Sequence, residues 1–219
     1  MKLRYVSLAL AGTLLAGGQI AMADGVAVGV KAGTLGAGVE LTTNVIPMLL
    51  NARIQANGFR YNTTVTNTSV HYDAKLKLMS VGALADFYPF AGKFRVTAGA
   101  YYNGNKLTLT GVPNGASYVI NGTTYTSAQA GSVTGTMDFN KLAPYAGIGW
   151  GDAVSSGSPI GFNVDLGVLY QGKPKTTLSA TGAAAGLTAD IAAEKTKLDN
   201  NVKKYKFYPV ASVGVSYNF

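Results

Sequence analysis

Apolar and polar residues alternate along residues 160–171, where Ile, Phe, Val, Leu, Val and Tyr occupy every second position. Side chains of an extended strand point alternately to its two faces, so the pattern predicts a β-strand with one apolar and one polar face. The same period of two recurs in about eight segments, each near the ~10 residues that a tilted membrane-spanning strand needs. The segments are 26–32, 35–42, 50–57, 72–87, 94–103, 142–150, 160–171 and 212–219.

The fourth segment departs from this regularity near Met79. Lys75 and Lys77 share one parity, whereas Ser80 and Asp86 share the other. One extra residue in a strand restores such a pattern, so we predict a β-bulge at this point.

The connections between the segments are sorted by length. Those after the second, fourth and sixth segments are short, "TNVIP", "PFAGK" and "GDAVSSGSP", whereas those after the third, fifth and seventh are long. Only the first connection breaks the rule by being short. This sorting is typical of outer-membrane barrels, which have short periplasmic turns and long outer loops. It favours an all-β fold, an eight-stranded antiparallel transmembrane β-barrel, over the alternative of a secreted β-sandwich.

Two of the long connections have patterns of their own. Residues 111–137 contain "YVINGTTYT", which predicts a hairpin turning at Asn121 and Gly122. Residues 183–206 are expected to be helical, because apolar residues recur there at helical spacing. That stripe consists of Leu187, Ile191, Leu198, Val202 and Tyr205.

The composition agrees with a barrel. Charged residues make up 13% of the chain, about half the usual share of a soluble domain. After residue 23 there is no apolar run of the ~20 residues that a spanning helix needs. Tyr and Phe gather at the segment ends, which predicts aromatic girdles at the two membrane interfaces. The girdle set is Tyr61, Phe87, Tyr88, Phe90, Phe94, Tyr102, Tyr170, Tyr208, Tyr217 and Phe219.

The first 23 residues have the features of a secretory signal peptide. Lys2 and Arg4 precede an uncharged apolar run, and Ala21-Met22-Ala23 forms a small-residue cleavage site. We therefore expect residues 1–23 to be removed and residues 24–219 to form the barrel. The chain has no Cys, which leaves no disulfide framework and no lipid attachment site.

The last segment carries a motif at its end. It resembles the targeting signal of outer-membrane barrels, polar-x-Gly-x-x-aromatic-x-aromatic, which is matched by Ser212, Gly214, Tyr217 and Phe219. The resemblance implies insertion by the barrel assembly machinery into the outer membrane of a Gram-negative bacterium. In a closed barrel the last strand pairs with the first and removes both edges.

The polar faces of the segments carry three basic and three acidic residues: Lys31, Glu40, Arg53, Asp86, Arg95 and Asp165. The interior of an eight-stranded barrel is about filled by side chains. Balanced charges in so narrow a lumen favour a salt-bridged network that blocks bulk flow, with a selective, gated path as the alternative.

The sequence favours a protein that is not an enzyme, with no catalytic residue, no metal site and no cofactor. His71 is the only histidine and shares a face with Asp73. A catalytic pair would need a nucleophile, for which only the nearby Ser69 and Ser80 are candidates, so a solvated histidine at the rim is the favoured interpretation. Residues 172–207 contain seven Lys against three acidic residues. This basic outer region suits the phosphates of outer-membrane lipids and lipopolysaccharide, or acidic solutes, and nucleic acid is not an expected partner.

Three stretches resemble the carbapenem-associated outer-membrane protein family, known as CarO. They are "INGTTYTSA…GSVTGTMDFNKLAPYAGIGW", "DLGVLYQGKPKTTL" and "KYKFYPVASVGVSYNF". The resemblance implies an eight-stranded barrel and a link to uptake of basic amino acids such as ornithine. Two functions therefore stay open: a non-enzymatic envelope barrel, structural or surface-exposed, and a narrow porin-like channel for small solutes.

Overall fold

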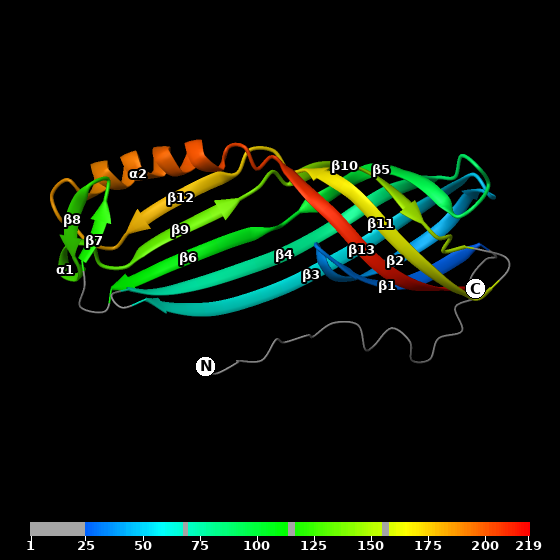
Figure 1. Ribbon diagram of the computed structural model, residues 1–219, viewed down its shortest axis with the longest axis horizontal. Helices are drawn as coiled ribbons and strands as arrows, with labels where there is room; N and C mark the ends of the chain where they lie inside the picture. The colour runs from blue at the N-terminus through cyan, green and yellow to red at the C-terminus, as the bar shows by residue number, and fades with distance from the viewer. Residues whose placement is uncertain (1–24, 68–69, 114–116, 155–157) are drawn as a thin grey trace.

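The computed structural model describes residues 25–67, 70–113, 117–154 and 158–219, so the predicted signal peptide lies outside the described residues. Eight of the described strands close into an antiparallel barrel in the order β1, β2, β3, β4, β5, β10, β11, β13, with β13 paired back to β1 (Figure 1). Their bounds are β1 Val26–Gly33, β2 Gly36–Ile46, β3 Leu50–Asn67, β4 Val70–Phe87, β5 Phe94–Asn103, β10 Leu142–Trp150, β11 Ile160–Tyr170 and β13 Phe207–Asn218. The predicted eight-stranded antiparallel barrel is confirmed.

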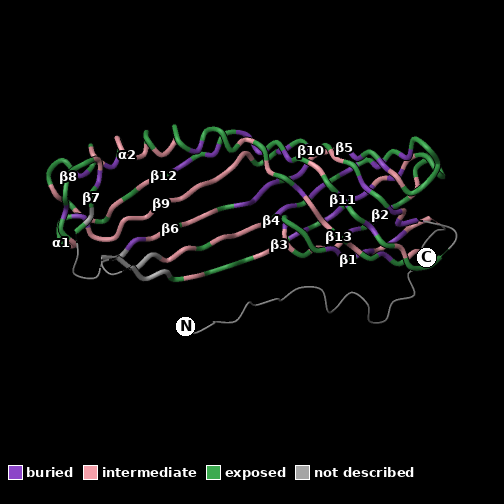
Figure 2. Tube along the Cα trace, in the orientation of Figure 1, coloured by how far each residue is buried: buried purple, intermediate pink, exposed green. Residues whose placement is uncertain are grey.

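The burial pattern follows the alternation of the sequence, as β11 illustrates. Phe162, Val164 and Leu166 are exposed on the outside of the barrel, whereas Asn163 and Asp165 are buried inside it. Figure 2 shows the same alternation of buried and exposed residues along the other barrel strands. The barrel thus presents an apolar surface to lipid and keeps its polar residues in the lumen.

The sheet of the barrel continues beyond one end of the barrel. The 18 residues of β3 and of β4 are about twice the length that a membrane strand needs, and their far halves continue into β6, β9 and β12. The added strands are β6 Lys106–Pro113, β9 Val133–Asp138 and β12 Lys175–Ala180. The long connection expected after residue 57 is present and consists mostly of strand. We call the far halves of β3 and β4, with β6, β9 and β12, the outer sheet.

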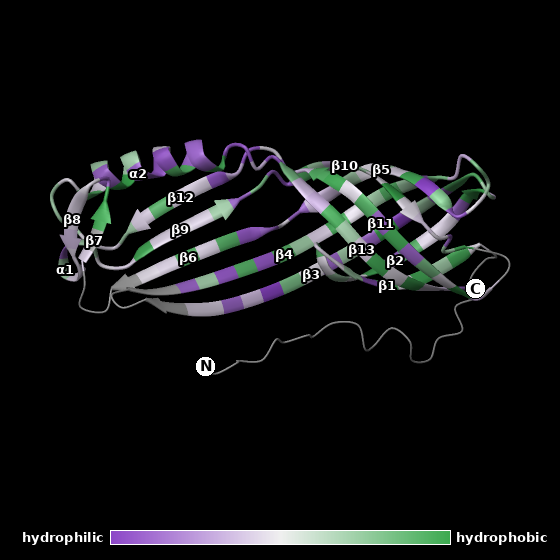
Figure 3. Ribbon diagram, viewed as in Figure 1, coloured by the Kyte–Doolittle hydropathy of each residue, from purple (hydrophilic) through white to green (hydrophobic). Residues whose placement is uncertain are grey.

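The expected β-bulge near Met79 is wrong. In the described residues β3 and β4 pair from Leu50 with Phe87 to Asn67 with Val70 without a shift of register. What changes at Met79 is the partner on the other edge of β4, which is β5 on one side and β6 on the other. The face that carries Val81 passes from lipid to water there, so its residues become polar although the alternation continues (Figure 3).

A small helical cap covers one end of the outer sheet. The helix α2, Leu187–Val202, packs on β12 and confirms the helical prediction. The predicted hairpin is confirmed as β7 Ser117–Ile120 and β8 Thr123–Thr126, with positive φ at Asn121 and Gly122, and the short helix α1 Ser127–Ala130 follows it. An apolar cluster joins these elements: Ile120, Tyr125, Ala130, Leu187 and Ile191. None of the described helices has the length and hydropathy to cross a membrane.

Asp190 on α2 fastens the hairpin to the helix. Its carboxylate accepts hydrogen bonds from the Asn121 amide at 3.0 Å and from the Tyr125 hydroxyl at 2.6 Å. These bonds lower the pKa of Asp190, the Asn121 bond foremost. The contribution to stability is therefore complete above the ordinary Asp pKa of about 3.9 and is lost as the pH falls through the lower folded value.

We expect Asp190→Ala to release the hairpin at neutral pH, because both donors lose their acceptor. Limited proteolysis should cut the turn at residues 121–122 several-fold faster than in the wild type, while Asp138→Ala on the outer sheet leaves the cutting rate unchanged. Wild-type amide signals of residues 117–126, followed by NMR, should change only on acidification below the ordinary Asp pKa. Equal cutting rates for Asp190→Ala and the wild type would contradict this arrangement.

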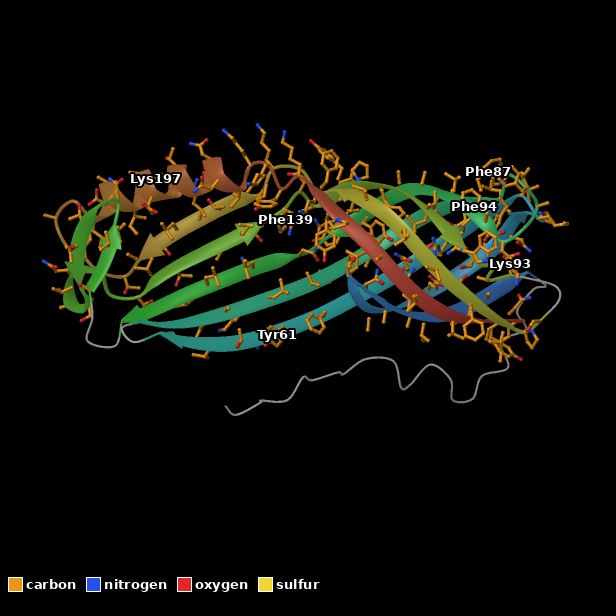
Figure 4. All side chains as sticks on the ribbon, viewed as in Figure 1. Tyr61, Phe87, Lys93, Phe94, Phe139 and Lys197 are labelled. Atoms are coloured by element: carbon orange, nitrogen blue, oxygen red, sulfur yellow. The ribbon has the colours of Figure 1, made fainter. Side chains whose placement is uncertain are left out.

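The aromatic residues form two belts, with three corrections. Figure 4 places Phe87 and Phe94 at the barrel end opposite the outer sheet. Tyr102 and Tyr170 are exposed at the rim next to the outer sheet. Three members of the predicted set do not face the membrane interfaces. Tyr88 is buried, and Tyr208 packs against buried residues inside the barrel. Tyr61 lies in the outer sheet. All three have the parity of the residues that point into the lumen, and not that of the lipid-facing residues.

Candidate functional site

The barrel lumen brings together all six charged residues that the sequence placed on polar strand faces. Each comes from a different strand: Lys31 from β1, Glu40 from β2, Arg53 from β3, Asp86 from β4, Arg95 from β5 and Asp165 from β11. Their side chains are between 2% and 6% exposed, and they form seven ion pairs with one another. Charges on opposite walls meet because a barrel of eight strands is narrow. We call these six residues the lumen charge network.

Asp165 is the centre of the network. Its carboxylate oxygens lie 3.2 Å from Lys31 Nζ, 3.0 Å from Arg53 Nη1 and 2.6 Å from Arg95 Nη2. One carboxylate therefore meets all three basic side chains, and each of these distances allows a charge-assisted hydrogen bond.

Arg53 connects the three carboxylates. Its guanidinium lies 3.4 Å from Glu40 Oε2 and 3.0 Å from Asp86 Oδ1, in addition to its contact with Asp165. The planar fork of Arg suits such multiple contacts better than the single ammonium of Lys.

Neutral side chains form further hydrogen bonds with the charged groups of the network. Thr97 donates a hydrogen bond to Asp86 Oδ1 at 2.6 Å, and Asn163 donates to Glu40 Oε1 at 3.3 Å. Lys31 Nζ also donates to Gln55 Oε1 at 2.8 Å. Three positive and three negative side chains thus balance in a buried site, as buried charges must.

Gly149 on β10 makes room for the network. A Cβ atom at this position would lie 2.7 Å from Arg95 Nε and 2.9 Å from Asp165 Oδ1. A side chain there would displace the pair, so the glycine at this position is explained by packing in the lumen.

An apolar layer lies next to the network, on the side of the outer sheet. Leu84 lies two residues from Asp86 on β4, and Leu169 lies four residues from Asp165 on β11, both on the inward face. The rings of Tyr101 and Tyr145 meet edge to face at 5.5 Å between centroids. The complete layer is Leu35, Leu84, Tyr101, Ala143, Tyr145, Leu169 and Val210, all less than 9% exposed.

The sequence reasoning missed this layer, although a signal for it exists. Tyr101 and Tyr145 share the parity of lumen residues such as Arg95 and Gly149, and Leu169 shares the parity of Asp165. Large apolar residues on an otherwise polar strand face indicate that the lumen is filled by side chains.

A small cavity separates the apolar layer from the lumen charge network. It measures about 10 Å³ and is lined by residues of both, including Lys31, Gln55, Tyr101 and Tyr145. This volume is about what one water molecule needs. The described side chains thus leave little space between the two layers.

His71 and Asp73 lie on β4 in the outer sheet, away from the lumen. The side chain of His71 lies outside the described residues, and Asp73 accepts a hydrogen bond from Thr64 at 2.7 Å.

The predicted assembly signal lies on β13 and the residue after it, Phe219, and β13 pairs with β1 and closes the barrel. Tyr217 and Phe219 are exposed on the outer surface, with ring centroids 5.1 Å apart. Ser212 and Gly214 pair with Gly33 and Lys31 of β1 on the alternate parity. The two aromatic rings thus remain accessible at the free end of the closing strand.

We expect Phe219→Ser to impair assembly into the outer membrane without altering export, because it removes the terminal aromatic of the signal. Phe90→Ser, an exposed aromatic at the same barrel end, is the matched control and should assemble normally. Heat-modifiable migration of outer-membrane fractions measures the folded protein. Normal levels of folded Phe219→Ser would show that this residue is not part of a signal.

Comparisons with known proteins agree with this architecture. No family model and no curated protein matches the sequence. Among solved structures, CarO and CarO2 of Acinetobacter baumannii each match with a TM-score of 0.58 and 26% identity, over 89% of this chain and 98% of theirs. The resemblance stated from the sequence is confirmed by these two structures. The protein is an eight-stranded β-barrel of the outer membrane of a Gram-negative bacterium, and it is similar to CarO.

Proposed function

We propose that the protein is a non-enzymatic envelope barrel whose lumen is closed and whose membrane part supports the outer sheet at the cell surface. One observation carries this proposal: two successive layers fill the lumen, the lumen charge network and the apolar layer. The cavity between them has room for about one water molecule.

The two layers would oppose ion flow for different physical reasons. An ion entering the lumen charge network would have to displace side chains that already pair with one another in a buried site. An ion entering the apolar layer would lose its hydration without finding polar partners. Because the layers lie in series along the barrel, opening one of them would leave the other closed.

A narrow uptake channel for small solutes such as basic amino acids is the second candidate, and only the resemblance to CarO favours it. A basic solute would need an acidic group free to bind it. Glu40, Asp86 and Asp165 each already lie within 4.0 Å of a basic side chain of the barrel. The geometry therefore supports the closed barrel better.

Electrical recording of the refolded wild-type protein in planar bilayers tests the proposal. We expect rare or very small currents, with an open general porin refolded in the same way as the positive control. Liposomes carrying the protein should take up lysine and glutamate no faster than empty liposomes. A steady, large conductance would overturn the closed barrel, and selective uptake of lysine would establish the second candidate.

A further inference from the structure

A row of basic side chains crosses the base of the outer sheet. Cross-strand pairing places Arg60 of β3 opposite Lys77 of β4, and Lys77 opposite Lys106 of β6. The same row continues through Asp138 of β9 to Lys175 of β12. Directly paired residues project from the same face of a sheet, so four cations and one acid share this row. We call Arg60, Lys77, Lys106 and Lys175 the basic row.

The basic row lies on the face that the barrel turns toward lipid. On β4, Lys77, Met79 and Val81 occupy alternate positions and so share one face, and Met79 and Val81 are exposed on the outside. On β3, Arg60 has the parity of the exposed Ile54. The row therefore continues the lipid-facing surface and does not face the lumen.

Its height matches the edge of the membrane. Lys77 is ten residues from Phe87, the lipid-facing residue with which β4 ends on the other side of the membrane. Ten residues span about 34 Å along a strand. At the usual tilt of about 40° this gives about 26 Å of height, close to the apolar band of about 25 Å in outer-membrane barrels. The charges of the basic row thus lie where the headgroups of the outer leaflet begin.

The described residues neutralise the row only in part. Among the described residues, Lys106 is the one member with an ion pair, at 3.6 Å from Asp138, and both side chains are more than a third exposed. Arg60 and Lys77 face each other as like charges, an arrangement that destabilises a sheet. An anion bound from outside would offset this repulsion.

We propose that the basic row binds the phosphate groups of lipopolysaccharide in the outer leaflet. Neighbouring strands are about 4.8 Å apart, so adjacent cations of the row can contact the same phosphate from two sides. Arg offers a planar fork that suits phosphate oxygens, and Lys a strong point charge. Because the row lies beside lipid and outside the lumen, the lipid headgroup, and not a solute passing through the barrel, is its ligand.

This binding would fix how deep and at what angle the barrel sits, since the row lies along one side only. The outer sheet would then stand on phosphorylated lipid at its base. The proposal is independent of whether the lumen conducts.

The test is the thermal stability of the refolded protein in a zwitterionic detergent, followed by heat-modifiable migration at increasing lipopolysaccharide concentration. We expect intact lipopolysaccharide to raise the midpoint of the wild type, while lipopolysaccharide stripped of its phosphates and inorganic phosphate alone leave it unchanged. Arg60→Gln combined with Lys77→Gln should need about 25-fold more lipopolysaccharide for the same rise, at roughly fivefold for each lost charge near a membrane surface.

Lys195→Gln combined with Lys197→Gln is the matched control, because it removes two charges from α2, which contacts the other face of β12 through Thr176 and Asp199. It should respond as the wild type does. Without lipopolysaccharide the Arg60 and Lys77 double variant should be at least as stable as the wild type, since the like charges are gone. Equal losses in both double variants, an equal response to the phosphate-free lipid, or an equal effect of inorganic phosphate would each overturn the proposal.

Discussion

Asp165→Ala is expected to destabilise the barrel by about 3–5 kcal/mol, the usual range when one partner of a buried ion pair is removed. Asp165 meets Lys31, Arg53 and Arg95, so its loss leaves three buried cations against two carboxylates. Urea unfolding of the refolded protein, monitored by heat-modifiable migration, measures the loss.

Asp138→Ala is the matched control for this variant. Asp138 pairs with Lys106 at the surface of the outer sheet, where an ion pair contributes at most about 1 kcal/mol. If Asp165→Ala unfolds no more easily than Asp138→Ala, the lumen charges are solvated and the dry network is refuted. We expect Asp165→Ala to conduct little, because the apolar layer stays in place.

Leu169→Ala is expected to cost about 2–5 kcal/mol, because Leu169 is fully buried in the apolar layer and its truncation leaves a cavity there. Leu166→Ala on the same strand is the control. Leu166 faces lipid, which can fill the vacated space, so its truncation should cost clearly less.

Conductance distinguishes the two layers. Neither Asp165→Ala nor Leu169→Ala should open the barrel alone, because each leaves one layer intact. The double variant, once shown to be folded by heat-modifiable migration, should show openings in planar bilayers that neither single variant shows. A single variant that conducts as well as the double variant would contradict two layers acting in series.

Much of the barrel follows from local sequence. A strand must bury one face and expose the other, so period-two alternation in residues such as Phe162 to Asp165 determines both the strand and the sides of its residues. The same parity placed all six lumen charges on the inward face. Their closeness to one another also follows, because eight strands enclose a narrow space.

The sequence-based predictions were wrong where the alternation rule for membrane strands was applied to strand segments that lie outside the lipid. At Met79 the polarity of the β4 face reverses because the strand leaves the lipid, which imitates the parity shift of a bulge. For the same reason residues 58–67 resembled a loop, because the face that points to lipid in the barrel carries the polar residues Arg60, Asn62 and Thr64 there. Tyr88 and Tyr208 were assigned to the girdles because aromatic residues near strand ends are common on both the lipid face and the lumen face.

Periodicity within single segments is enough to predict the barrel, its closing strand, the helix α2, the hairpin at Asn121, and the sign and parity of the lumen charges. Three features became visible in the folded chain alone: which charges pair, the apolar layer that Tyr101 and Leu169 help to form, and the single row of Arg60, Lys77 and Lys106. These features depend on register between strands distant in sequence, and register is set by packing of the whole sheet.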